Sequence, residues 1–138
     1  MPRVLSIDYG LKRTGIAFTD PLKIIATGLT TVETKKLMTF LRDYFLKEEV
    51  ELVIIGMPVN LDDSDTHITP MVAHFIKSFG KIFPAIPIQT VDERYTSKMA
   101  SQAMLDMGLK KKQRQNKAMV DEIAATIMLQ EWLNKANI

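Results

Sequence analysis

The chain has 138 residues, 46% hydrophobic and 25% charged, and its 18 Lys and Arg against 16 Asp and Glu give a formal net charge of +2. These proportions are typical of a globular protein and exclude extended disorder and collagen-like repeats. The lack of cysteine excludes disulfide bonds, thiolate zinc sites and thiol nucleophiles. No apolar run approaches the ~20 residues of a membrane-spanning helix, and no signal-peptide cleavage site follows Arg3. We expect one cytoplasmic domain over residues 1–138, and a pI near 8.8 is compatible with a nucleic acid partner.

The first part of the chain predicts three strands, at residues 3–10, 15–19 and 23–31. The first two are short apolar runs that end at turn signals, Gly10 and Asp20-Pro21. The connections are too short for the crossover that parallel neighbours require, so the strands should form an antiparallel meander.

From about residue 34 the chain alternates between helices and strands. Apolar spacing and capping residues predict four helices: from residue 34, over 71–79 with an end near Gly80, from Thr96 or Ser97 to Gly108, and over 118–134. Apolar runs predict strands at 52–55 and 86–91, and Pro87 places the second at a strand start or a sheet edge. This order predicts an α/β fold, a mixed five-stranded sheet with helices on both faces.

Asp8 is the first acidic residue in an unexpected place. Strand alternation puts it on one face with Val4 and Ser6, while Leu5 and Ile7 lie on the other. A carboxylate there needs a partner, a metal ion or a nearby opening to solvent. The alternative is that Asp8 simply begins the turn that follows the strand.

A second acidic group, Asp92-Glu93-Arg94, follows the strand at residues 86–91. Adjacent residues of an extended segment point in opposite directions, so at most one of the two carboxylates should face the same cleft as Asp8. Arg94 could form a salt bridge or contact a phosphate. The alternative is an ordinary charged loop.

The third is Asp121 in the last predicted helix. It precedes Ala124, Met128 and Trp132 by three, seven and eleven positions, whereas Glu122 is rotated by about 100°. Asp121 therefore interrupts an apolar helix face. Complementation of the helix dipole would explain an acid near the helix start but not its place on that face.

Together, two of these acids follow strands of one sheet and the third comes from a helix that can lie across it. Converging carboxylate oxygens suit Mg²⁺ or Mn²⁺, and two such ions ~4 Å apart can activate water and stabilise the leaving oxygen of a phosphodiester. Neither His67 nor His74 lies in a metal-ligand motif, which disfavours zinc.

Several short motifs carry a resemblance over nearly the whole chain. They are Ile7-Asp8-Tyr9-Gly10, Lys12-Arg13-Thr14-Gly15, Thr19-Asp20, Gly56-Met57-Pro58, Asn60 with Asp62-Asp63-Ser64, Asp92-Glu93-Arg94-Tyr95-Thr96-Ser97, and Asp121-Glu122-Ile123-Ala124-Ala125. In this order they resemble the YqgF family, whose members are described as Holliday junction resolvases or pre-16S rRNA nucleases with an RNase H-like fold.

The resemblance implies that Asp8, Glu93 and Asp121 are the catalytic and metal-binding residues. It implies hydrolysis of phosphodiester bonds in structured nucleic acid with Mg²⁺ or Mn²⁺, favouring the 5′ end of pre-16S rRNA in ribosome biogenesis. The sequence departs from the family at Asp63, where Gly is usual. Asp tolerates a positive φ, but another negative charge near a phosphate path could weaken binding.

Basic residues supply candidate nucleic-acid contacts. Those near the acids are Lys12, Arg13 and Arg94, and those of the basic connector at 109–117 are Lys110, Lys111, Lys112, Arg114 and Lys117. They could neutralise several phosphates and make binding salt-dependent, although the connector could also be a solvated loop. Without a base-reading motif, we expect recognition of backbone and shape.

Other functions remain open at this stage. The pattern Asp8-x-Gly10-x₄-Gly15 is similar to the phosphate loop of actin-like and sugar-kinase folds, but this chain supplies only one of their two lobes. A non-catalytic nucleic-acid-binding factor would share the fold and the basic connector. Resolution of Holliday junctions in DNA recombination would need two active sites, usually in a dimer. We expect a monomer or weak homodimer with no membrane association.

Overall fold

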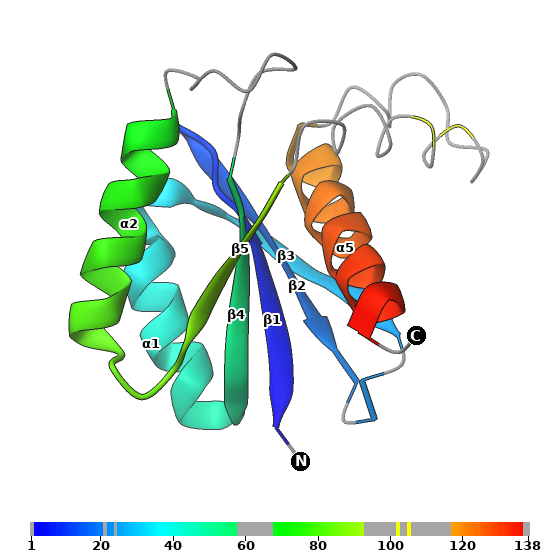
Figure 1. Cartoon of the computed structure of the whole chain (residues 1–138). Coiled ribbons are helices and arrows are strands. Elements are labelled where there is room, and N and C mark those ends of the chain that lie inside the picture. The colour runs from blue at the N-terminus through cyan, green and yellow to red at the C-terminus, as the bar shows by residue number, and fades with distance from the viewer. Residues whose placement is uncertain are drawn as a thin grey trace.

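A mixed five-stranded sheet lies between the helices (Figure 1). The computed structural model describes residues 2–20, 22–23, 25–57, 68–92, 102, 105 and 117–136. The strands are β1 (Arg3–Asp8), β2 (Arg13–Thr19), β3 (Ala26–Glu33), β4 (Val50–Met57) and β5 (Ile88–Asp92), in the order β3-β2-β1-β4-β5. The β1–β2 and β2–β3 pairs are antiparallel, and the β1–β4 and β4–β5 pairs are parallel. The predicted meander and mixed sheet are confirmed, and Pro87 immediately precedes edge strand β5.

Helices cover both faces of this sheet, as predicted (Figure 1). The 3-10 helix η1 (Thr34–Lys36) leads into α1 (Leu37–Lys47), which lies with α2 (Thr69–Ile82) on one face. Helix α5 (Lys117–Ala136) packs on the other. None of the helices in the described part of the chain is both long and apolar enough to cross a membrane.

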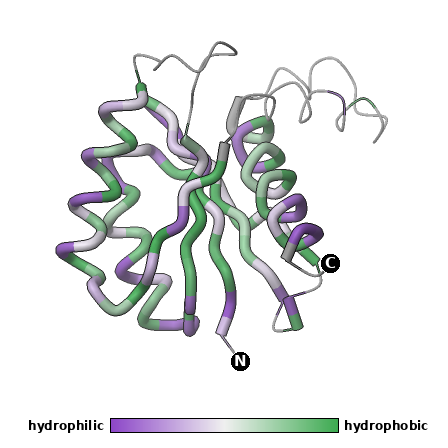
Figure 2. Tube along the Cα trace, viewed as in Figure 1, coloured by the Kyte–Doolittle hydropathy of each residue, from purple (hydrophilic) through white to green (hydrophobic). Residues whose placement is uncertain are grey.

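Strand β1 contributes to both core layers. The buried Ile7 packs with side chains of α1 and α2, whereas Val4 packs with side chains of α5. The buried Ser6 donates a hydrogen bond from Oγ to the carbonyl oxygen of Ala125 at 2.9 Å. Hydrophobic residues accordingly run along the middle of the central strands in Figure 2. Alternation places Asp8 on the α5 side of the sheet, with Val4 and Ser6.

Strand β3 begins at Ala26, three residues later than predicted. The chain first turns around Asp20, whose carbonyl oxygen accepts from the Lys23 N–H and whose carboxylate accepts from the Ile25 N–H, both at 2.9 Å. Lys23 adopts a left-handed conformation with φ 58°. This turn uses the residues that the apolar pattern had assigned to the strand.

Helix α2 ends two residues after Gly80, near which the prediction placed its end. The helix continues to Ile82, and the Phe83 N–H still donates to the Phe79 carbonyl oxygen at 2.8 Å. A single glycine costs about 1 kcal/mol relative to alanine within a helix, which packing of the buried Phe79 can offset. The ends of the other described elements lie within three residues of their predicted positions.

Some predictions fall outside the described residues. These are the polar loop with Asn60 and Asp63, and most of the predicted helix from Thr96 or Ser97, of which Gln102 and Leu105 are described and helical. The basic connector also lies outside them, except for Lys117 at the start of α5.

Candidate active site

The three parallel strands end at one edge of the sheet. Asp8 is the last residue of β1, Met57 of β4 and Asp92 of β5. The registers place Met57 beside Asp92 and put the end of β1 next to β4. Ligands of open α/β sheets bind outside the carboxyl ends of such strands. Glu93 is the residue after Asp92 in the chain and lies outside the described residues.

Asp121 reaches the same region from helix α5. The helix lies so close to β2 that a Cβ atom on Gly15 would be 2.0 Å from the Asp121 carbonyl oxygen, so this position requires glycine. Gly15 is also the cross-strand partner of Asp8. Asp8 and Asp121 are thus both neighbours of one glycine, on the same face of the sheet. The placement of Asp121 on the sheet side of the helix agrees with its spacing to the buried Ala125.

Glu122 also lies over the sheet, which sequence reasoning missed. A Cβ atom on Gly28 of β3 would lie 2.5 Å from the Glu122 Oε1 atom. The helical wheel had turned Glu122 away from the apolar face. Because α5 packs across β3 as well as β2, residues on two sides of the helix meet the sheet. Glycine at position 28 was the signal that could have indicated this close approach.

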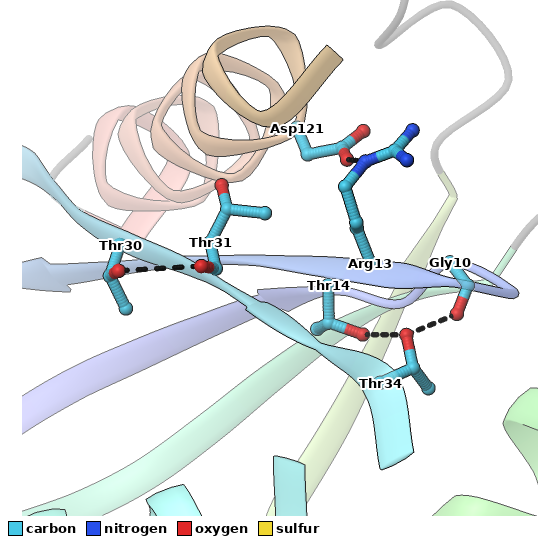
Figure 3. Close-up of polar contacts among 7 residues, drawn as sticks. All are labelled: Gly10, Arg13, Thr14, Thr30, Thr31, Thr34 and Asp121. Carbon is cyan, nitrogen blue, oxygen red and sulfur yellow. Dashed lines mark hydrogen bonds and ion pairs between the residues drawn. The ribbon is translucent and has the colours of Figure 1, made fainter. Parts of the chain in front are cut away.

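An ion pair joins Arg13 to Asp121 (Figure 3). The Arg13 Nε atom donates to Asp121 Oδ2 at 3.3 Å, and the two side chains are 37% and 28% exposed. Arg13 was predicted as a nucleic-acid contact, and the structure places its guanidinium directly at a candidate metal ligand. Its neighbour Lys12 is exposed on the β1–β2 turn.

Hydrogen bonds to Thr34 hold that turn in place (Figure 3). The Thr34 hydroxyl donates to the Gly10 carbonyl oxygen at 2.6 Å, and the Thr34 N–H donates to the Lys12 carbonyl oxygen at 2.9 Å. Because the single hydroxyl hydrogen of Thr34 goes to Gly10, the buried Thr14 hydroxyl donates to Thr34 Oγ1, 2.9 Å away. The segment before α1 thereby fixes the turn that carries Lys12 and Arg13.

Tyr9, between Asp8 and Gly10, faces the opposite layer. Its ring lies against Phe75 of α2, with 5.3 Å between the centroids. Burial raises the pKa of the Tyr9 hydroxyl above its ordinary value of 10.0. The hydroxyl therefore stays protonated near neutral pH and is no candidate for a general base.

The donor set suits a hard divalent cation. Asp8 and Asp121 offer carboxylate oxygens, the ligands that Mg²⁺ and Mn²⁺ prefer. Within the ranges that the structure describes, no three acidic, histidine or cysteine residues are grouped as a metal site. The third predicted ligand, Glu93, falls outside those ranges, as do Arg94, Lys110, Lys111, Lys112 and Arg114. His74 is exposed on α2 and lines none of this site.

A family model described as "RuvX: Holliday junction resolvase" matches residues 2–135. The chain belongs to the RuvX family. This confirms the resemblance carried by the motifs, since RuvX and YqgF denote one family.

RuvX relatives from several bacteria match nearly the whole chain. A protein of Flavobacterium psychrophilum named "Putative pre-16S rRNA nuclease" is 57% identical, and the match covers 98% of both chains. A protein of Christiangramia forsetii with the same name is 56% identical over 96% of this chain and 98% of its own.

Solved resolvase structures share the fold. The Fowlpox virus resolvase, determined with Holliday junction DNA, gives a TM-score of 0.58 at 13% identity, over 97% of this chain and 98% of that one. RuvC of Thermus thermophilus gives 0.55 at 13% identity, over 98% and 96%. These similarities confirm the RNase H-like fold of this RuvX family member.

Proposed function

We propose that this protein is a metal-dependent nuclease that hydrolyses phosphodiester bonds in structured nucleic acid, and that its substrate is the 5′ end of pre-16S rRNA. One observation carries the proposal. Asp8 and Asp121, from a strand end and a crossing helix, are both neighbours of Gly15 at the edge of the sheet where β5 ends. Membership of a nuclease family supports the same conclusion.

Asp8, Glu93 and Asp121 would hold the cations in this account. When bound there, Mg²⁺ or Mn²⁺ would lower the pKa of a water molecule and would stabilise the oxygen that leaves the phosphorus atom. Hydrolysis then adds hydroxide to the phosphorus, breaks the bond to the leaving oxygen and returns a proton to that oxygen. The chain's own contribution is to orient the carboxylates, through the close contact of α5 with Gly15.

The basic residues would neutralise the substrate backbone. Lys12 is exposed beside the acids and can approach the scissile phosphate. Arg13 can exchange its contact with Asp121 for a phosphate when cations occupy the carboxylates, since both are anionic partners for a guanidinium. Arg94 and the basic connector, from Lys110 to Lys117, would hold the flanking strand.

The names of the relatives favour RNA over DNA as the substrate. Resolution of Holliday junctions is the second candidate, because the family model carries that description. A symmetric four-way junction needs two active sites, whereas one rRNA end needs one. A monomer or weak homodimer in the cytoplasm fits the RNA substrate.

A cleavage assay with two substrates tests this choice. Purified protein would be incubated with one of two substrates, either a 16S rRNA precursor that contains its 5′ leader or a four-way DNA junction. Each substrate would be tested with Mg²⁺, Mn²⁺ or EDTA. The proposal predicts metal-dependent cutting of the precursor and an intact junction. Cutting of the junction alone would assign the resolvase function, and salt-sensitive binding of both without cutting would favour a non-catalytic factor.

A further inference from the structure

A hollow of about 570 Å³ opens between the β1–β2 turn and η1. Its lining residues are Leu11, Lys12, Arg13, Glu33 and Lys35. Arg13 contributes to this hollow and also contacts Asp121, so the hollow begins at the candidate active site. A strand that leaves the active site on this side would enter it directly.

The charges around this hollow are predominantly positive. Three of the lining residues are basic, namely Lys12, Arg13 and Lys35, and one is acidic, Glu33. The Glu33 Oε2 atom lies 3.5 Å from the Lys35 ammonium and 4.0 Å from that of Lys36. The side chains of Glu33, Lys35 and Lys36 are 54%, 79% and 69% exposed, respectively. The ion pairs are therefore weak, and the lysines can exchange Glu33 for another anion.

A second hollow of about 570 Å³ continues from the first and shares Glu33 and Lys35 with it. Its walls include the apolar side chains of Val32 and Phe40. Thr39, Lys36 and a second acid, Asp43, also line it, so two lysines and two carboxylates surround this hollow. The Phe40 ring is stacked on Tyr44, with 6.1 Å between their centroids. An aromatic wall beside two lysines offers a stacking surface next to cations.

We propose that these two hollows form one groove, which binds a single-stranded segment of the nucleic acid beside the cleavage site. Lys12, Lys35 and Lys36 contact its phosphates, and a base enters the second hollow against Phe40. An unpaired strand can present a base face to an aromatic side chain, whereas the bases of a duplex are stacked on one another. This inference rests on the proposed function and specifies the form of the substrate.

The two walls of this groove are joined before any ligand binds. Thr34, the first residue of η1, hydrogen-bonds to the carbonyl oxygens of Gly10 and Lys12. The lysines of η1 and Lys12 are therefore held on opposite sides of a fixed connection. Little of the backbone has to be ordered when a strand binds, which favours affinity.

Binding should be measured with the Asp8→Asn variant, so that cleavage does not consume the ligand. The probes are an RNA single strand and a blunt RNA duplex of equal length, titrated over a range of salt concentrations. Lys35→Gln/Lys36→Gln removes two positive charges from the groove. Lys77→Gln/Lys81→Gln removes two from exposed positions of α2 that line neither hollow and serves as the matched control.

The proposal predicts that Lys35→Gln/Lys36→Gln weakens single-strand binding about tenfold and reduces the slope of log K against log salt by about 1.4, for two lost phosphate contacts. Duplex binding should change much less, and the α2 control should bind both probes normally. Glu33→Gln should strengthen single-strand binding, which damage to the fold would not do. Phe40→Leu, which keeps an apolar side chain against the core, should weaken single-strand binding about fivefold or more through lost stacking.

Equal effects of the groove and α2 variants on single-strand binding would overturn the proposal. Equal losses of single-strand and duplex affinity would also overturn it, as would a failure of Asp8→Asn to bind the single strand. Normal single-strand binding by Phe40→Leu would overturn the base contact. Cleavage by the wild type is measured separately. If the groove proposal fails, the proposed nuclease activity is therefore unaffected. If the wild type is inactive, the binding result remains valid.

Discussion

The Nε atom of Arg13 lies 3.3 Å from Oδ2 of Asp121, and this contact links the β1–β2 turn to helix α5. Both side chains are partly exposed, so the pair contributes little to stability. Its position is more informative, because the guanidinium lies where a cation bound by Asp121 would compete with it. The side chain of Arg13 and a divalent ion are thus alternative partners of one carboxylate.

Replacement of Arg13 by Gln should separate these roles. Without the competing guanidinium, the protein alone should bind Mg²⁺ more tightly, while nucleic acid binds more weakly because a phosphate contact is lost. The free energy of unfolding should change by less than about 1 kcal/mol. Calorimetric titration with Mg²⁺ and a nucleic-acid binding assay measure the two effects. Weaker Mg²⁺ binding by the variant would show that Arg13 supports the metal site instead of competing with it.

Gly15→Ala tests the close approach of α5 to the sheet. The new Cβ atom would meet the Asp121 carbonyl oxygen at 2.0 Å, and this backbone atom can move only with the helix. We expect a loss of about 1–3 kcal/mol or more in the free energy of unfolding, together with loss of cleavage. Gly80→Ala in α2 is the control, since nothing lies within 4 Å of its Cβ position. It should stabilise the protein by about 0.5–1 kcal/mol, and similar effects of both variants in urea denaturation would contradict the account.

Thr34→Val tests the connection between η1 and the turn. The substitution keeps the shape of the side chain but removes the bond to Gly10 and leaves the buried Thr14 hydroxyl without its acceptor. The free energy of unfolding should fall by about 1–3 kcal/mol. Thr14→Val should relieve part of this loss, so the double variant should be more stable than the sum of the single changes predicts. Strict additivity in denaturant titrations would show that the two hydroxyls are not coupled.

Burial of two tyrosines predicts a loss of stability at alkaline pH. Burial raises the pKa values of Tyr9 and Tyr44 above 10.0, with opposing smaller effects of Arg3 and Glu48 on Tyr44. As pH rises past 10.0, the unfolded chain releases these protons first, so stability is complete below that pH and is lost as pH rises through the folded-state values. Tyr9→Phe/Tyr44→Phe should show a smaller alkaline decrease in the free energy of unfolding than the wild type. Parallel curves for the two proteins would contradict this prediction.

The strand and helix periods were sufficient to predict the sheet and the positions of two acids. Alternation in β1 placed Asp8 on the face of Ser6, and the structure puts α5 over that face through the bond from Ser6 to Ala125. The spacing of Asp121 to Ala125 likewise placed it toward the sheet. Both inferences use only local geometry, which a sequence specifies directly.

Contacts between distant segments could not be predicted in this way. The Arg13–Asp121 pair depends on where α5 crosses β2, and the position of Glu122 over Gly28 depends on how far the helix extends across β3. The bond between Thr14 and Thr34 joins β2 to η1 and depends on their register. Gly80 located the end of α2 only to within two residues, because glycine alone does not impose a helix end without a left-handed residue or a capping partner.

The central claim is that Asp8 and Asp121 hold the catalytic cations. Its most direct test compares metal-dependent cleavage of the rRNA precursor by the wild type, Asp8→Asn, Asp121→Asn and Glu122→Gln. Glu122 is the matched control, because it adjoins Asp121 in the chain but directs its carboxylate to Gly28 of β3. The account predicts that both Asn variants lose cleavage by at least about 100-fold while they remain folded and bind RNA, and that Glu122→Gln stays active. Activity retained by either Asn variant, or a loss in Glu122→Gln as large as in Asp121→Asn, would contradict it.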